Sequence, residues 1–159
     1  QADAGEIIID GYKREFASPQ QAIAAGIGMV HQHFKLVQAF TVAENIHLGW
    51  DETPRRASAS KLERRTADLA KRFNLQVRPG ARISDLSTGE QQRVEILRVL
   101  ARQARVLILD EPTAVLTPAE ARELFSALRN FVSEGNAVFF ISHKLDEVLE
   151  IFSGNFISV

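Results

Sequence analysis

The sequence contains no cysteine, and none of its nine glycines is followed by lysine. Without cysteine there is neither a disulfide framework nor a thiolate metal site, and this fits a reducing compartment. No apolar run approaches the roughly 18–20 residues that a membrane-spanning helix needs. The first five residues lack the charge and the apolar stretch of a signal peptide. We therefore expect any association with a membrane to depend on a partner.

The charge of the chain is nearly balanced. Nineteen Lys and Arg residues face twenty Asp and Glu residues, which leaves a formal net charge of −1. A general nucleic-acid binder is usually strongly basic, so we expect no nucleic-acid partner. A hydrophobic content of 45% is ordinary for a soluble globular domain, and 159 residues suffice for one domain or part of one.

Strands and helices alternate at both ends of the chain, with a mostly helical block between them. Apolar runs predict strands over residues 6–10, 29–32, 106–110 and 137–141, and the start of another at 156–159. Apolar spacing and capping signals predict helices over residues 19–25, 42–48, 61–74, 89–103, 118–134 and 144–151. This order predicts an α/β fold, a parallel sheet with an inserted helical subdomain. We expect one domain over 1–159, with an α/β core from 1–35 and 104–159 and the helical subdomain at 36–103.

A polar cluster opens the helix predicted at 89–103. In the run LSTGEQQR, which begins at Leu86, Ser87 and Glu90 have the spacing of a capping box. Gly89 in the first turn lets a ligand approach the backbone, and the free amides and the helix dipole favour an anion. A capped helix with a purely structural role gives the same pattern, so the capping box alone leaves both interpretations open.

Two adjacent carboxylates, Asp110 and Glu111, stand at the end of the apolar strand that begins at Val106. Ligands of open α/β sheets bind at the carboxyl edge of the strands. One acid there can hold Mg²⁺, which prefers oxygen ligands, and the other can take a proton from an attacking water. A strand-end pair of acids that only faces solvent is compatible with the same residues.

Histidines mark two further places beside predicted strands. His143 follows the strand at 137–141, and His31 and His33 flank Gln32. Alternate residues of a strand point the same way, but two histidines without further ligands do not make a metal site. The residues alone assign no function to either place.

Taken in order, these elements resemble the ATP-binding domain of ABC transporters. Residues 86–90 resemble its LSGGQ signature, with Thr88 in place of the first of two glycines and Glu90 in place of glutamine. The segment VLILDEP at 106–112 resembles the Walker B motif with its catalytic glutamate. The resemblance extends over residues 30–145 and implies a partial P-loop NTPase fold. The segments LSTGEQQRVEILRVLAR and LILDEPTAVLTP are similar in sequence to the ATP-binding subunits of simple-sugar and nucleoside importers.

The resemblance implies a role for individual residues. It makes Glu111 the general base, and His143 the switch histidine that bonds the γ-phosphate and the attacking water. Asp110 would orient the magnesium shell, and Gln32 of the Q-loop would reach the magnesium and the water when the site closes. The serine and the second glycine of the signature would touch the γ-phosphate of ATP held by the opposite protomer. The implied nucleotide-binding set is Ser87, Thr88, Gly89, Glu90 and Gln91.

One position departs from the family pattern. Residues 114–117 sit at the D-loop, and Thr117 stands where the family usually has aspartate. The D-loop's contacts with the opposite protomer therefore do not carry over directly. Thr117 is also a good N-cap for a helix that starts at Pro118, which explains it without a catalytic role.

The phosphate-binding loop of the family, G-x-x-x-x-G-K-[ST], does not occur in the sequence. Gly26-Ile27-Gly28 is no substitute, because no lysine follows it. We expect the chain to be a fragment of a longer ATPase subunit. By itself it should bind ATP and Mg²⁺ weakly or not at all and should not hydrolyse ATP. It should also expose the strand at 137–141 as a bare edge and self-associate.

For the whole protein, the resemblance implies ATP hydrolysis, with ATP and Mg²⁺, coupled to uptake of a sugar or nucleoside. The implied partners are transmembrane permease subunits, a second ATPase domain or subunit, and an extracellular or periplasmic solute-binding protein. The implied location is peripheral, at the cytoplasmic face of the plasma (inner) membrane. One alternative is a non-transport ABC ATPase of translation or DNA repair, which lacks the importer-like segment 37–45. Another is a non-catalytic fragment that serves as a folding unit.

Overall fold

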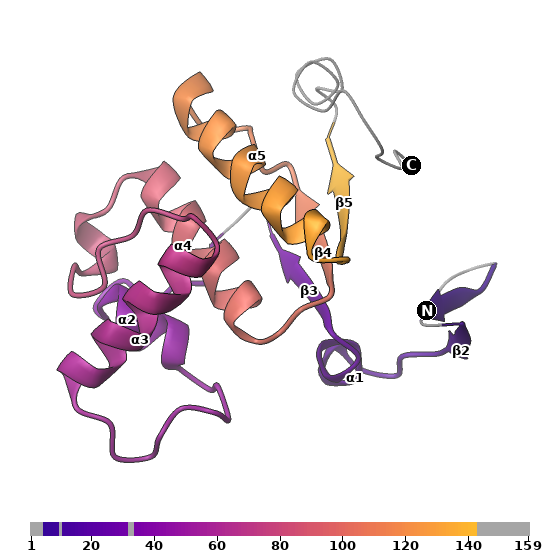
Figure 1. The fold of residues 1–159 in the computed structure, drawn as a ribbon, viewed down its shortest axis with the longest axis horizontal. Helices are drawn as coiled ribbons and strands as arrows, with labels where there is room; N and C mark the ends of the chain where they lie inside the picture. Colours follow the sequence, from indigo (N-terminus) through magenta and orange to yellow (C-terminus); the bar gives the residue numbers. More distant parts are fainter. Residues whose placement is uncertain (1–4, 10, 32–33, 143–159) are drawn as a thin grey trace.

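The computed structural model describes residues 5–9, 11–31 and 34–142 of the chain. Within them, a parallel sheet of three strands lies at the centre (Figure 1), in the order β3 (Ile27–Val30), β4 (Val106–Asp110) and β5 (Ala137–Ile141). The register places Val30 beside Leu109. Because the strands are parallel, their carboxyl ends meet at one edge. The predicted α/β fold with a parallel sheet is confirmed.

Helices α2, α3 and α4 form a block beside the sheet, whereas α5 lies across it (Figure 1). The bounds of the helices are α1 Pro19–Ala24, α2 Val42–His47, α3 Ala59–Arg72, the 3-10 helix η1 Ile83–Asp85, α4 Thr88–Ala101 and α5 Pro118–Ser133. The block falls within residues 36–103, the range expected for a helical subdomain. The boundaries of that subdomain stay a prediction.

Capping boxes start α2, α4 and α5. The N-caps are Thr41, Ser87 and Thr117, and the glutamates that return the hydrogen bond are Glu44, Glu90 and Glu120. Each such cap satisfies two amides that the helix leaves unpaired, and losing an N-cap side chain typically costs about 1 kcal/mol. The helix starts at residues 88 and 118 are therefore determined locally, within one residue of where the sequence places them.

An apolar stripe on α5 faces the core. Leu124, Phe125, Leu128 and Phe131 are all buried, and they belong to one cluster with residues of α4 and β4. The ring of Phe125 lies 5.7 Å from that of Phe140 on β5. Burying side chains of this size contributes about 1.5–3 kcal/mol each, so the stripe fixes α5 against the sheet.

The amino-terminal strands differ from the prediction. A hairpin of β1 (Ile7–Ile9) and β2 (Tyr12–Arg14) replaces the single strand expected at 6–10, because the chain turns back near Gly11 at a φ of 78°. The next strand begins two residues earlier than expected. Gly28 belongs to β3, where a Cβ would lie 2.1 Å from a methyl carbon of Val99. This glycine serves close packing against α4 and does not break the strand.

The helices α3 and α4 end two residues before the predicted ends at 74 and 103. Asn74 and Gln103 have left-handed φ angles of 52° and 57°. A residue in this conformation cannot continue a right-handed helix, so it terminates the helix just before it. The elements expected at 144–151 and 156–159 lie outside the described residues. Within the part that the structure describes, no helix is both long enough and apolar enough to cross a membrane.

Candidate active site

The two predicted acids lie at the carboxyl edge of the central strand. Asp110 is the last residue of β4 and pairs in register with Ile141. Glu111 follows with a left-handed φ of 49°, and its N–H donates to the carbonyl of Ile141 at 2.8 Å. A non-glycine residue held in this conformation costs about 1–3 kcal/mol, and such residues concentrate at functional sites. The chain thus turns sharply at Glu111 and leaves both carboxylates at the sheet edge.

The signature segment lies at the amino end of α4. The N–H of Ser87 donates to Glu90 Oε2 at 2.8 Å, and the N–H of Glu90 donates to Ser87 Oγ at 3.2 Å. The bond from the Ser87 amide is the main reason that the pKa of the Glu90 carboxyl lies below its usual value, and Arg78 lowers it further. An Nη atom of Arg78 lies 3.0 Å from Glu90 Oε1. The negative charge of Glu90 is therefore compensated at the place where an anion is expected.

Gly89 is buried, whereas Ser87 and Thr88 are exposed. A Cβ built on Gly89 would meet Glu120 of α5, with Oε1 at 2.0 Å. The glycine therefore has a packing reason within the chain, in addition to any approach by a ligand. Sequence reasoning missed this contact, since nothing local links residues 89 and 120.

The polar side-chain atoms of Gln91 are hydrogen-bonded within the chain. Its Nε2 donates to the carbonyl of Leu86 at 3.1 Å, and its Oε1 accepts from Gln38 at 3.4 Å. The side chains of Gln91 and Glu90 thus stabilise the start of α4. Their role as nucleotide ligands stays a prediction.

Helix α4 also holds the segment that follows the Q-loop position. The buried carboxylate of Glu95 accepts from the N–H of Lys35 at 2.6 Å, and Arg98 donates to the carbonyl of Lys35 at 3.0 Å. Glu95 and Arg98 are themselves paired at 2.8 Å. These anchors were not identified from the sequence, where a charged pair three residues apart on a helix is typical of a solvent-exposed face.

The structure brings some predicted site residues together and leaves others untested. Asp110 and Glu111 meet at one strand end, and α4 contacts the following residue, Pro112, through a hydrogen bond from Gln92. Gln32 and His143 lie outside the described residues. Among the described residues, no group of three or more His, Cys, Asp or Glu side chains could hold a metal ion. Two carboxylates fit Mg²⁺ that is bound through one or two acids together with phosphate oxygens.

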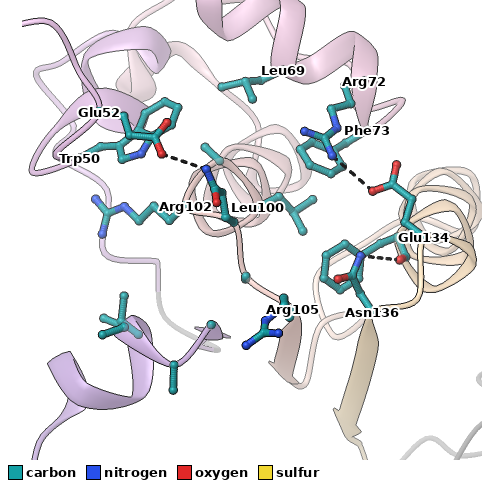
Figure 2. A pocket seen from close by; sticks show the side chains of 18 of the residues that line it. Trp50, Glu52, Leu69, Arg72, Phe73, Leu100, Arg102, Arg105, Glu134 and Asn136 are labelled. Carbon is teal, nitrogen blue, oxygen red and sulfur yellow. Dashed lines mark hydrogen bonds and ion pairs between the residues drawn. The ribbon is translucent and has the colours of Figure 1, made fainter. Parts of the chain in front are cut away.

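A large cavity lies away from these residues. It has a volume of about 850 Å³ and opens near Arg105, just before the first residue of β4, whereas Asp110 is the last. Figure 2 shows ion pairs and hydrogen bonds among the residues that line the cavity. Arg72 lies 3.5 Å from Glu134, and Arg102 donates to the carbonyl of Leu48 at 2.7 Å. Because these arginines stand at the carbonyl ends of α3 and α4, the helix dipoles account for their charge. The cavity is not the predicted site.

Comparison with known proteins connects the chain to ATP-binding transport proteins. The family described as ABC transporter matches residues 1–114. The nucleoside import ATP-binding protein NupA of Lactococcus lactis subsp. cremoris is 50% identical over 149 residues, which cover 91% of this chain and 29% of NupA. The ribose import ATP-binding protein RbsA of Chelativorans sp. is 46% identical over 148 residues, which cover 93% of this chain and 29% of RbsA. The chain thus spans less than a third of the length of these curated relatives.

Solved structures share the fold. The dimeric ATP-binding cassette MJ0796, bound to ADP and phosphate, matches with a TM-score of 0.71 and 27% identity, over 91% of this chain and 65% of that chain. The cbiO1 structure from Clostridium perfringens matches with a TM-score of 0.73 and 26% identity, over 94% of this chain and 60% of that chain. The ATPase-cassette fold expected from the sequence is confirmed.

Proposed function

Because this chain belongs to the ABC transporter family, we propose that it carries the part of an importer's ATPase that acts on the γ-phosphate of ATP. We propose that it works inside a longer ATP-binding subunit, here called the parent subunit. Two facts support this. The curated relatives are about three times as long as the matched region. The 159 residues contain no Gly-Lys pair, which supports the proposal that another segment supplies the phosphate-binding lysine.

The proposal for the chemistry rests on the backbone conformation of Glu111. Its left-handed backbone and its bond to the carbonyl of Ile141 hold it at the sheet edge directly after Asp110. We propose that the Glu111 carboxylate accepts a proton from the attacking water. Asp110 would help to hold Mg²⁺, which, when bound with ATP, neutralises charge on the phosphates. Gln32 and His143 stay proposals from the family resemblance, as magnesium-and-water contact and switch histidine.

The amino end of α4 supports the second half of the proposal. Ser87 is exposed at the start of a 14-residue helix, where the unpaired amides and the helix dipole favour a phosphate. The pairing of Glu90 with Arg78 reduces the repulsion that a carboxylate would otherwise impose there. We propose that Ser87 and Gly89 act on ATP held by a second ATPase domain or subunit, with Thr88, Glu90 and Gln91 shaping the same helix start.

The names of the relatives support the direction of transport and the solute class. NupA is a nucleoside import ATP-binding protein and RbsA is a ribose import ATP-binding protein. We propose that the parent subunit drives uptake of a sugar or nucleoside and docks on transmembrane permease subunits at the cytoplasmic face of the membrane. A solute-binding protein on the other side of the membrane would deliver the solute.

The Glu111→Gln substitution in the parent subunit tests the chemical proposal. We expect it to abolish ATP turnover and to leave ATP binding intact, because glutamine keeps the shape but cannot accept the proton. The control is Glu123→Gln on α5, which removes an exposed carboxylate outside the proposed site. Turnover that survives within about tenfold corresponds to a barrier change of only ~1.4 kcal/mol and would show that Glu111 is not the base.

Calorimetry on the 159 residues by themselves tests the need for a further segment. We expect no ATP affinity in the micromolar range, because the amides and the lysine of a phosphate-binding loop are not among these residues. Micromolar binding of ATP by this chain would contradict the proposal that another segment captures the nucleotide.

A further inference from the structure

Gln92 connects the signature helix to the residue that follows the proposed base. It lies in the second turn of α4 and is 3% exposed. Its Nε2 donates to the carbonyl of Pro112, which directly follows Glu111. We infer that Gln92 is a positioning residue, which fixes the peptide after Glu111 and thereby links the position of α4 to that of the base. This inference rests on the proposed role of Glu111.

The backbone around Glu111 needs support on both sides. Its φ of 49° is unfavourable for a residue with a side chain. On one side, the Glu111 N–H is bound to the carbonyl of Ile141 at 2.8 Å. On the other side, the carbonyl of Glu111 accepts from Ala114 at 3.3 Å, and that of Pro112 accepts from Gln92. Of the three partners, Ile141 belongs to β5 and Ala114 to the turn itself, whereas Gln92 belongs to α4, so its hydrogen bond ties the turn to α4.

Stability alone does not favour glutamine at this position. The Oε1 atom of Gln92 is buried and accepts no hydrogen bond in the described part of the chain. An unsatisfied buried acceptor costs about 1–3 kcal/mol. Methionine has nearly the same length and would remove that acceptor, although it would leave the Pro112 carbonyl without its donor. One unmet acceptor replaces another, so we expect little net change in the stability of the fold.

Helix α4 is also hydrogen-bonded to the segment that follows the Q-loop position. Glu95 and Arg98 hold the N–H and the carbonyl of Lys35 at 2.6 and 3.0 Å. A movement of this segment would therefore shift α4, and the hydrogen bond from Gln92 would transmit that shift to Pro112. This arrangement gives Gln92 a specific place between two parts of the proposed catalytic machinery.

The first test compares Gln92→Met with the wild type in the parent subunit. We expect kcat to fall by about tenfold or more, because small misplacements of a catalytic group cost up to roughly 10²-fold. We expect KM for ATP to change by less than about twofold and the melting temperature to stay close to that of the wild type. The matched control is Gln103→Met, which removes another glutamine amide, bonded to Glu52 at 2.9 Å just beyond the end of α4. Its kcat should stay unchanged.

The second test uses the pH profile of Gln92→Glu. An ionised glutamate cannot donate to the Pro112 carbonyl, whereas a protonated one can. We therefore expect the kcat of this variant, divided by that of the wild type at each pH, to rise as the pH is lowered. Because an ionised glutamate at this buried position also destabilises the fold, the ratio is taken per folded molecule, and a residue that only fills space would then give a constant ratio.

The outcomes separate this inference from the function on which it rests. If the wild-type parent subunit hydrolyses no ATP, or Glu111→Gln keeps its turnover, the proposed function is wrong. If Glu111→Gln is inactive while Gln92→Met keeps kcat within about twofold of the wild type, the function stands and the inference about Gln92 is wrong. A loss of kcat that follows the loss of folded protein, with a constant Gln92→Glu ratio, would also overturn the positioning role.

Discussion

Gly89 at the start of α4 lies so close to Glu120 of α5 that a Cβ on it would come within 2.0 Å of the Oε1 atom. The carboxylate cannot withdraw freely, because Glu120 Oε2 accepts from the N–H and from the hydroxyl of Thr117, each at 2.9 Å. The tight approach of the two helices therefore depends on a glycine on one side and on a capping glutamate on the other.

We expect Gly89→Ala to lower the free energy of unfolding of this chain by about 1–3 kcal/mol, the usual cost of overpacking. The new methyl group would displace Glu120 and break the cap of α5. Urea denaturation measures the change.

The double variant with Glu120→Ala isolates the contact. Since the obstacle is then gone, adding Gly89→Ala to Glu120→Ala should cost at least about 0.5 kcal/mol less than it does in the wild type. Equal costs in the two backgrounds would show that Gly89 and Glu120 are not coupled.

The capping glutamates predict how stability responds to acid. The pKa of Glu120 is lowered mainly by its bond from the Thr117 amide, and that of Glu90 by its bond from the Ser87 amide, each from an ordinary value of 4.5. A lowered pKa in the folded state means that the ionised form stabilises the fold. This contribution is present above about pH 4.5 and is lost as the pH falls toward the lower folded pKa values.

The variant Glu90→Gln/Glu120→Gln tests this response. Glutamine keeps the capping box but does not titrate. We expect the wild type to lose more stability than this variant between about pH 5 and 3, in urea denaturation series at both ends of that range. Parallel losses would show that other carboxylates cause the acid sensitivity.

His47 predicts a second pH effect at higher pH. It is buried, its Nδ1 lies 3.0 Å from the Thr53 hydroxyl, and its ring stacks on Trp50. Burial is the main reason that the pKa of His47 lies below 6.5, and the positive charge of Arg65 lowers it further. As the pH is lowered, His47 is therefore protonated in the unfolded chain at a higher pH than in the folded chain. The stability that neutral His47 contributes is complete above pH 6.5 and decreases as the pH drops below it.

We expect His47→Gln to remove the decline between about pH 6.5 and 5, because glutamine is neutral throughout and can still hydrogen-bond to Thr53. Thermal denaturation at several pH values measures the slope. The absolute stability of the variant should be lower at pH 7.5, owing to the lost packing on Trp50. A slope equal to that of the wild type would contradict a buried neutral histidine.

Strand β5 predicts self-association of this chain. In the described part of the chain, its one neighbour is β4, and Phe139 and Ile141 are 40% and 51% exposed. An apolar strand at a sheet edge is a template for pairing with another chain. We expect light scattering to show dimers or larger species that become more abundant with concentration.

Phe139→Lys should reduce this association, because a lysine on an edge strand opposes pairing. Ile23→Lys on α1 is the matched control, since it removes an exposed apolar side chain that does not belong to β5. A monomer at all concentrations in the wild type, or an equal effect of both variants, would contradict association through β5.

Local patterns in the amino-acid sequence were sufficient for several elements. The capping boxes at Ser87 and Thr117 and the apolar strand before Asp110 each depend on residues within one short window. Their hydrogen bonds and periodic burial arise wherever that window occurs, which is why the helix starts at residues 88 and 118 and the strand bounds at 106–110 were predictable to within one residue.

Other features depend on residues that are far apart in the chain. Strand β3 begins at Ile27, two residues before the expected start at 29, and its Gly28 packs against Val99 of α4, which is distant in the sequence. The hairpin of β1 and β2 was missed because its strands have three residues each, too few for a clear periodic signal.

The sequence was therefore enough to identify the acids at a strand end and the signature at a helix start. The contacts from Gln92 to Pro112, from Glu95 to Lys35 and from Gly89 to Glu120 came only from the folded chain. A local pattern specifies the backbone of one element, whereas the approach of two elements depends on how the whole core packs.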